Sequence, residues 1–357
     1  VTNNYIGTNV LGTAAAPNNL GIGILTTTSQ INIGIDISNG NVISGNSNAA
    51  INMFIGATQQ DIVIAGNKIG LNAEGNDKIP NTNWGIYQTI SAIPLTLSSV
   101  TIGGDSDINR NFFAGNGTTN SKSHIYLNTP ASNTLDVGIY NNFFGTDISG
   151  DLDLDSNGTV TYRASVKIYG PTSYTGVQNA LKIGESGKGN LFRFNISFSI
   201  SLYGSPDVDI FENTFCDNVI RLDNLFSANT DIFTSAFYTG VARIYNNFFG
   251  ITNLDPYFGK TTGNGKASLN VYSSNQGKLY IKGNNFSGSQ ISSIAIQEQN
   301  IPFRRLNSTL LNLTDEIFIG GSELQAGSLC NGSEQNCFSQ LRSEEHTSEL
   351  QSLRHLV

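Results

Sequence analysis

Short runs of alternating apolar and polar residues recur along the chain, and each is bounded by Gly or Asn. Examples are Asp61–Ala65, Val166–Tyr169 and Lys278–Lys282. A period of two over four to six residues, rich in β-branched and aromatic types, indicates β-strands. Convincing helical patterns of ten or more residues are few before Arg342, so the alternation predicts an all-β fold.

Two phrases alternate between these runs. The first is Asn-Asn or Gly-Asn, then two mostly apolar residues and Gly, and it occurs at Asn3–Gly7, Gly66–Gly70, Asn141–Gly145 and Asn246–Gly250. In the first three copies an Asn or Asp stands two residues after the last Gly and a second Gly stands five after it. This spacing is typical of a turn capped by an Asx side chain. The second phrase begins with Ile-Gly and ends in Asn, starting at Ile33, Ile102 and Ile183.

Repeats of this kind predict a solenoid, because each copy buries its apolar side against the next copy. The intervals from Asn46 to Asn67 and from Asn195 to Asn213 suggest about fifteen coils of ~22 residues, stacked roughly 4.8 Å apart. Asn tolerates the left-handed conformation of a sharp corner, and stacked amides can form a hydrogen-bonded ladder. The candidates for that ladder are Asn46, Asn67, Asn116, Asn142, Asn247 and Asn285.

The combined motif, GN-x-[IF]-G-T-[DN]-x-x-G followed by IGG…N-x-[IF]-x-G-N, resembles the bacterial right-handed parallel β-helix repeat proteins of pectin-lyase-like architecture. The resemblance covers most of Val1–Leu341. It implies one domain, a single-stranded right-handed parallel β-helix, which we expect to be truncated at both ends. Proteins of this class are surface or extracellular proteins without known catalysis, or enzymes that act on acidic polysaccharides. The resemblance therefore also implies a secreted or cell-surface location.

The segment Arg342–Val357 breaks this texture, because it is charged and favours a helix. It resembles the translation of a sequencing adapter, and we interpret 342–357 as a non-native tail. A natural amphipathic C-terminal helix is the alternative.

Composition narrows the possible partners. The chain has 27 Asp and Glu against 19 Lys and Arg, a net charge of −8, which argues against binding to nucleic acid. No run of 18 apolar residues predicts a membrane span. We expect a monomer that contacts a polysaccharide or a cell-surface glycan.

One acidic loop suggests a metal. Asp151, Asp153, Asp155 and Asn157 place oxygen ligands at alternate positions, as at the start of a calcium loop. The twelfth position of that loop is Ala164 instead of a bidentate Glu, so a solvated acidic loop without Ca²⁺ is the alternative.

A second acidic pair suggests catalysis. Asp207 and Asp209 point to the same face of a strand, and Arg221 or Arg243 follows them. In a polysaccharide lyase, carboxylates of this kind would hold Ca²⁺ and the Arg would act as the base. A glycoside hydrolase would instead use two carboxylates roughly 5–10 Å apart. The alternative is an ordinary solvent-facing pair.

Several other side chains carry weaker expectations. His124, at the polar start of a strand, is expected at the surface or in a turn, and Cys216 is expected to be a small buried apolar residue. Cys330 and Cys337 form a local disulfide if the protein is exported, or remain two free thiols.

In the Asn-Asn phrase, alternation predicts that one aromatic residue points inward and one outward. We expect Phe144 and Phe249 inside, and Tyr5, Phe143 and Phe248 in an outward row that could stack on sugar rings. Lys68 interrupts this row. Together these patterns favour a non-catalytic scaffold, adhesion or carbohydrate-binding module. The alternatives are a lyase or hydrolase of acidic polysaccharide, or a structural spacer.

Overall fold

The computed structural model describes most of the first 250 residues and short segments thereafter. The described ranges are 1–25, 30–55, 61–90, 98–118, 122–129, 135–155, 164–170, 181–195, 198–204, 206–216, 218, 230–234, 240–250, 267–273, 278–287, 292–298, 316–319 and 337–339. Within them the chain forms 28 β-strands and a single 3₁₀ turn, η1 (Asp107–Asn109). The expected tail, 342–357, lies outside these ranges.

The strands form three parallel sheets, and every third strand belongs to the same sheet. Sheet 1 contains β1 (Tyr5–Ile6), β4 (Val42–Ile43), β7 (Lys68–Ile69), β10 (Phe112–Phe113), β13 (Phe143–Phe144), β16 (Leu191–Arg193), β19 (Thr214–Cys216), β22 (Phe248–Phe249), β25 (Asn285–Ser287) and β28 (Cys337–Ser339). Sheet 2 contains β2 (Leu20–Ile24), β5 (Ala49–Ile55), β8 (Trp84–Ile90), β11 (Ser123–Asn128), β14 (Ala164–Tyr169), β17 (Phe198–Tyr203), β20 (Thr230–Thr234), β23 (Ala267–Ser273) and β26 (Ser292–Glu298). Sheet 3 contains β3 (Gln30–Ile33), β6 (Asp61–Ile64), β9 (Ser98–Gly103), β12 (Leu135–Tyr140), β15 (Leu181–Ile183), β18 (Asp207–Phe211), β21 (Val241–Tyr245), β24 (Lys278–Lys282) and β27 (Glu316–Ile319).

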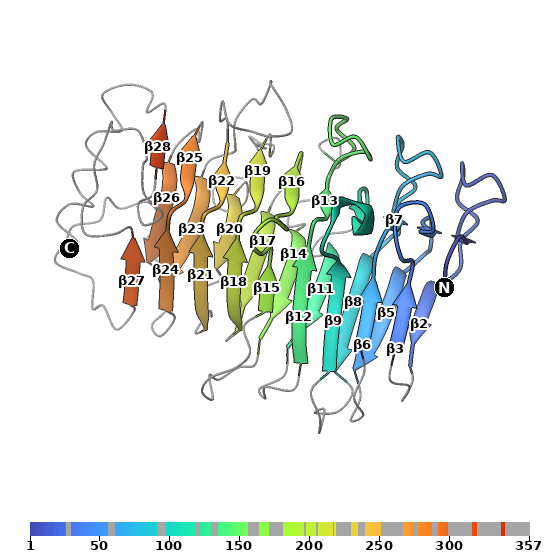
Figure 1. Ribbon diagram of the computed structural model, residues 1–357, viewed down its shortest axis with the longest axis horizontal. Coiled ribbons are helices and arrows are strands. Elements are labelled where there is room, and N and C mark those ends of the chain that lie inside the picture. Colours follow the sequence, from blue (N-terminus) through green and yellow to red (C-terminus); the bar gives the residue numbers. More distant parts are fainter. Residues whose placement is uncertain are drawn as a thin grey trace.

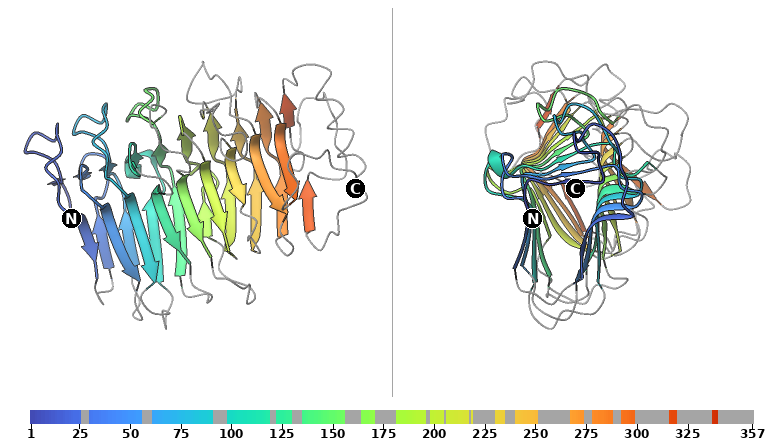
Figure 2. Two further views of the ribbon diagram at one scale, coloured as in Figure 1. Left: turned by 180° about the vertical axis from the view of Figure 1, so that it is seen from behind. Right: turned by 90° about the vertical axis from the view of Figure 1, so that its right-hand side faces the viewer.

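Each winding of the chain contributes one strand to each sheet, so the fold is a parallel β-helix, as the sequence predicts (Figure 1). The described strands make nine complete windings and one further strand. A view along the long axis shows the three sheets around a common interior (Figure 2).

The windings are longer than the expected ~22 residues. Aligned residues in neighbouring windings are 23 positions apart at Leu191 and Thr214, but 52 apart at Asn285 and Cys337. The difference arises because loops of variable length join the strands. The interval from Asn46 to Asn67 misled the estimate, since these two residues occupy different corners of the winding.

A column of aromatic rings fills part of the interior. Phe113, Phe144, Phe192, Phe215 and Phe249 stack along the axis with ring centroids 4.7 to 4.9 Å apart. All five are fully buried, and Ile and Val side chains of sheets 2 and 3 pack around them. The inward orientation predicted for Phe144 and Phe249 is therefore confirmed.

The predicted outward aromatic row is only partly correct. Phe143 is 3% exposed and lies in a second apolar cluster with Phe112, Leu154 and Leu191. It is buried because the loop that follows β13, which carries Leu154, folds back over the outer side of sheet 1. Tyr5 is exposed at 49%, and Phe248 is half-buried.

Asparagines that are buried in all but the first winding form two amide ladders along the axis, at two corners of the winding. The first ladder consists of Asn4, Asn41, Asn67, Asn111, Asn142, Asn190, Asn213, Asn247 and Asn284. The second contains Asn18, Asn46, Asn81 and Asn116, and Asn195 pairs with Asn218 in later windings. Five of the six predicted ladder residues are confirmed, but on two ladders. Asn285 is wrong, because its neighbour Asn284 occupies the ladder position.

The residue before a ladder Asn usually makes the bend. Asn3, Asn141 and Asn246 have φ of 55 to 56°, and Gly66 and Gly283 have φ of 76° and 66°. In each Asn-Asn phrase the first residue therefore adopts the left-handed conformation and the second forms the ladder. The sequence analysis assigned both roles to one Asn.

Three loops project from sheet 1 and stack on one another (Figure 1). They follow β1, β7 and β13, and backbone bonds join them from Ala73 N to Gly12 O and from Ile148 N to Gly75 O. A Cβ atom on Gly75 would lie 2.3 Å from Cγ2 of Ile148, so the stack requires glycine at this position.

Candidate functional site

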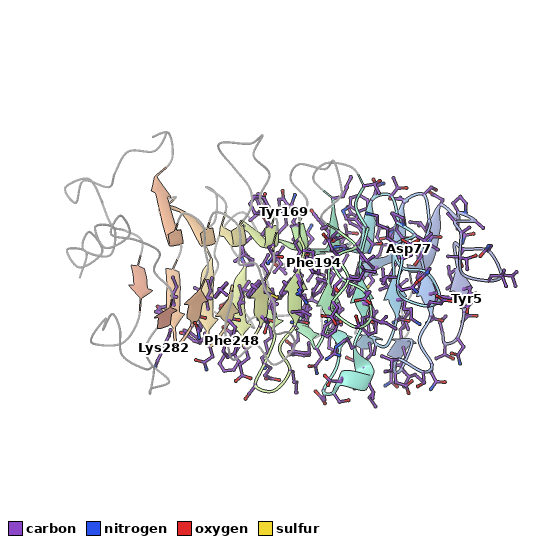
Figure 3. All side chains as sticks on the ribbon, turned by 90° about the horizontal axis from the view of Figure 1, so that it is seen from above. Tyr5, Asp77, Tyr169, Phe194, Phe248 and Lys282 are labelled. Carbon is purple, nitrogen blue, oxygen red and sulfur yellow. The ribbon has the colours of Figure 1, made fainter. Side chains whose placement is uncertain are left out.

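A second aromatic column runs along the outside of sheet 2. Trp84 and Tyr87 of β8 stack with centroids 4.2 Å apart, and Tyr126 of β11 lies 5.1 Å from Tyr87. Tyr169 of β14 lies 5.5 Å from Tyr126 and 4.6 Å from Tyr203 of β17. All five side chains are half-buried. We call these five residues the outer aromatic column. Figure 3 labels Tyr169 of this column, which lies on the opposite side of the molecule from Phe248.

The column forms because neighbouring strands of sheet 2 are aligned in register, and successive residues of each strand point alternately into and out of the core. Ile86, Ile125, Val166 and Ile200 are aligned across four strands and are fully buried in the core. The next residue along each strand points away from the core, and this outward row reads Tyr87, Tyr126, Lys167 and Ser201. Tyr169 and Tyr203 are aligned two positions further along.

Two lysines accompany the rings. Lys122 Nζ lies 4.0 Å from the ring centroid of Trp84, and Lys167 Nζ lies 5.0 Å from that of Tyr203. Neither makes an ion pair with a carboxylate in the part of the chain that the structure describes. Burial lowers the pKa of Lys167 below its usual value, and the charge of Lys122 lowers it further. The face is therefore locally positive on a chain whose net charge is −8.

Buried polar atoms without hydrogen-bond partners gather on the same sheet. Among the described residues they include Asn52 Oδ1, Trp84 Nε1, Thr89 Oγ1, Ser123 Oγ and Ser201 Oγ. Asn52 aligns with Tyr87, and Ser201 aligns with Lys167, so these two belong to the outward row. Buried polar groups are normally paired, so these atoms set the sheet apart, but because they are buried they do not themselves contact a ligand on its surface.

Two tyrosines of the column, Tyr126 and Tyr169, remain neutral at physiological pH. Burial raises the pKa of Tyr126 to about 12, with smaller contributions from Tyr87 and Tyr169. Burial also raises the pKa of Tyr169, and Tyr203 adds to this effect. The phenols therefore keep their hydrogen-bond donors across the whole range in which proteins are stable.

The structure also brings together part of the predicted catalytic group. Arg243 Nη1 donates to Asp207 Oδ1 at 2.7 Å and to Asp209 Oδ1 at 2.9 Å, on the outer side of sheet 3. Burial, together with the charge of Asp209, raises the pKa of Asp207 by more than Arg243 lowers it. Burial lowers the pKa of Arg243, but its bonds to the two carboxylates outweigh that effect and raise it overall. One guanidinium nitrogen therefore joins both carboxylates in this cluster. Arg221 lies outside the described residues.

The predicted calcium ligands do not share one environment. The side chain of Asp151 is 65% exposed and lies 3.5 Å from Arg193 Nη1. Asp155 is buried and accepts a bond from Gly115 N at 2.7 Å. Asn157 lies outside the described residues. Within those residues, no three His, Cys, Asp or Glu side chains are gathered in a way that could hold a metal ion.

The expectation of a surface or turn histidine at position 124 is wrong. His124 is fully buried, and its Nε2 lies 2.8 Å from Asp155 Oδ2. Its Nδ1 lies 3.2 Å from Nδ2 of Asn116, a member of the second ladder. The ring packs beside Phe113 and Phe144, with its centroid 6.3 and 6.2 Å from theirs. Although His124 begins a strand, its position at a corner of the winding turns it inward. Cys216 is fully buried, as predicted, while Cys330 lies outside the described residues.

The outer aromatic column was missed by the sequence analysis. The available signal was a buried Ile or Leu followed directly by Tyr, at Ile86–Tyr87, Ile125–Tyr126, Ile168–Tyr169 and Leu202–Tyr203. The aromatic residues of the Asn-Asn phrase belong to sheet 1, so that phrase does not indicate the tyrosines of sheet 2.

Two further observations bear on function. Among the helices in the described ranges, none has the length and hydropathy needed to cross a bilayer. In comparisons with protein-family models, with curated proteins and with solved structures, the chain matches none of them.

Proposed function

We propose that the chain is a non-catalytic carbohydrate-binding module, secreted or at the cell surface, that binds polysaccharide on the outer side of sheet 2. The observation that carries this proposal is the outer aromatic column with its two lysines. Glycans need apolar ring contacts together with many hydrogen bonds, and amphipathic tyrosines supply both.

The spacing of the column suits a repeating ligand. Tyr126, Tyr169 and Tyr203 come from three successive windings, and their centroids are 5.5 and 4.6 Å apart. The same kind of contact therefore recurs at each winding along the axis. A polymer with a regular repeat makes several of these contacts at once, and linked contacts raise the overall affinity beyond that of a single one.

Affinity electrophoresis tests the proposal. The protein is run in gels with and without polygalacturonate, alginate or xylan, alongside the double variant Tyr126→Phe/Tyr169→Phe. We expect at least one polysaccharide to retard the native protein, and the variant to be retarded less because it lacks two phenolic donors. Tyr5→Phe, on an exposed tyrosine of sheet 1, is the matched control and should migrate like the native protein.

The alternative, a polysaccharide lyase, is tested in the same solutions. The protein is incubated with polygalacturonate or alginate plus Ca²⁺, and ultraviolet absorbance from an unsaturated product is followed over time. The proposal expects no product. Product that forms with the native protein and disappears in Asp207→Ala would replace the proposed function with catalysis at the Asp207–Arg243 cluster.

A further inference from the structure

The inner rings of the outer aromatic column have other rings on both faces. Tyr126 lies between Tyr87 and Tyr169, and Tyr169 lies between Tyr126 and Tyr203. Because the faces are covered in this way, solvent reaches mainly the ring edges. The edge of an aromatic ring carries the positive part of its quadrupole and favours contact with the negative face of another ring. The column therefore presents a row of edges that suits a flat aromatic molecule.

The lysines on this face favour a bound molecule that carries a negative charge. Lys167 Nζ lies 5.4 Å from the Tyr169 centroid and 5.0 Å from that of Tyr203, near the end of the column away from Trp84. Lys122 stands over Trp84 at one end. In the described part of the chain no carboxylate neutralises either lysine. A ligand that bears a negative group gains an ionic contact that a neutral one lacks, and the contact is strengthened by the partial burial of Lys167.

We propose that the outer side of sheet 2 binds planar aromatic anions, the class that includes phenolic carboxylates. The aromatic part of the ligand lies across the edges of Tyr126 and Tyr169, and its carboxylate meets Lys167. This activity goes beyond glycan binding, because it uses the rings and the lysine and does not need the phenolic hydroxyls.

Trp84 provides the readout, because it is the single tryptophan of the chain and belongs to the column. Its fluorescence is followed during titration with cinnamate, and calorimetry gives the affinity independently. Two analogues serve as controls: cinnamamide keeps the flat ring without the charge, and 3-cyclohexylpropanoate keeps the charge without the flat ring. We expect saturable binding of cinnamate, and binding about tenfold weaker for each analogue, since each lacks one contact worth about 1.4 kcal/mol.

Variants locate the site. Tyr126→Ala should weaken cinnamate binding about tenfold, because it removes a central edge contact. Lys167→Met should weaken it and abolish its salt dependence. Tyr126→Phe should bind cinnamate within about twofold of the native protein, since the ring remains. Tyr5→Ala is the control that should change nothing. Circular dichroism shows whether each variant is folded. If Tyr126→Ala is not folded, the binding of cinnamate to Lys167→Met tests the site instead.

The outcomes separate this inference from the proposed glycan binding. Tyr126→Phe/Tyr169→Phe is expected to lose retardation by polysaccharide while it keeps cinnamate binding. Cinnamate binding without any polysaccharide binding supports the inference and refutes the proposed function. The inference is overturned if cyclohexylpropanoate binds as well as cinnamate, or if folded Tyr126→Ala and Lys167→Met bind cinnamate like the native protein.

Discussion

The first amide ladder offers the sharpest test of how this fold is held together. Asn142 Oδ1 accepts bonds from Asn111 N at 3.3 Å and from Asn111 Nδ2 at 3.0 Å. Its own Nδ2 donates to Asn190 Oδ1, Ile102 O and Tyr140 O, all at 2.9 to 3.0 Å. Asn142 is fully buried. The substitution Asn142→Ala therefore leaves two donors of Asn111 without an acceptor and without access to water.

Each orphaned buried donor costs about 1–3 kcal/mol, so we expect Asn142→Ala to lower the free energy of unfolding by about 2–6 kcal/mol. Asn142→Asp keeps the acceptor but turns an oxygen toward three other oxygens, and it should cost at least as much above the pKa of the new carboxyl. Urea unfolding followed by circular dichroism gives the total. Hydrogen exchange shows whether the loss is confined to the neighbouring windings, as expected for a solenoid.

The control for this test is Asn76→Ala, because Asn76 is exposed in a surface loop. It should change the free energy of unfolding by less than about 0.5 kcal/mol. The reasoning is refuted if Asn142→Ala costs no more than Asn76→Ala, or if Asn142→Asp unfolds at the same urea concentration as the native protein at neutral pH.

Three further predictions concern other parts of the molecule. Gly75→Ala should cost about 1–3 kcal/mol more than Gly187→Ala in urea unfolding, because both have positive φ but only Gly75 has a neighbouring side chain within 4 Å of the new Cβ. The raised pKa of Tyr126 means that its contribution to stability is complete below about pH 10 and is lost between about pH 10 and 12. An alkaline titration of thermal stability should therefore show a smaller loss in Tyr126→Phe than in the native protein, and parallel curves would contradict the assignment. Asp155→Ala should lower the melting temperature and speed the hydrogen exchange of Gly115, since it removes the acceptor of that amide; unchanged exchange would rule out this bond.

Much of the architecture could be predicted from the chain itself, because its repeats are local. The alternation in Val166–Tyr169 and Lys278–Lys282 places strands where the structure has β14 and β24. The Asn-Asn phrase identifies a corner of the winding, since few residues other than Gly and Asn tolerate positive φ there. The stacking of Phe144 on Phe192 and of Phe249 on Phe215 follows from the same repetition.

The candidate site and the winding length could not be predicted in the same way, because both depend on loops. Alternation along its strand predicts that Phe143 is exposed, and the residue is buried only because the loop that carries Leu154 covers it. The outer aromatic column requires Tyr87, Tyr126 and Tyr169 to lie next to one another, although about forty residues separate neighbouring members along the chain. Their alignment depends on the lengths of the intervening loops, which no local pattern encodes. Asp207 and Arg243, 36 positions apart, meet for the same reason.

The direction of the amide ladder has a consequence for how such a chain can change in length during evolution. Each interior Asn of the first ladder donates toward the following winding and accepts from the preceding one, so the junctions of this ladder are chemically equivalent. Residues 190–212 contain β16, β17 and β18, one strand from each sheet. Their loss would bring Asn142 against Asn213 and Phe144 against Phe215, with donors still facing acceptors. Deletion or duplication of a whole winding thus preserves the pairing of the first ladder, whereas a deletion that removes a ladder Asn but keeps the rest of its winding would leave amides facing unlike partners.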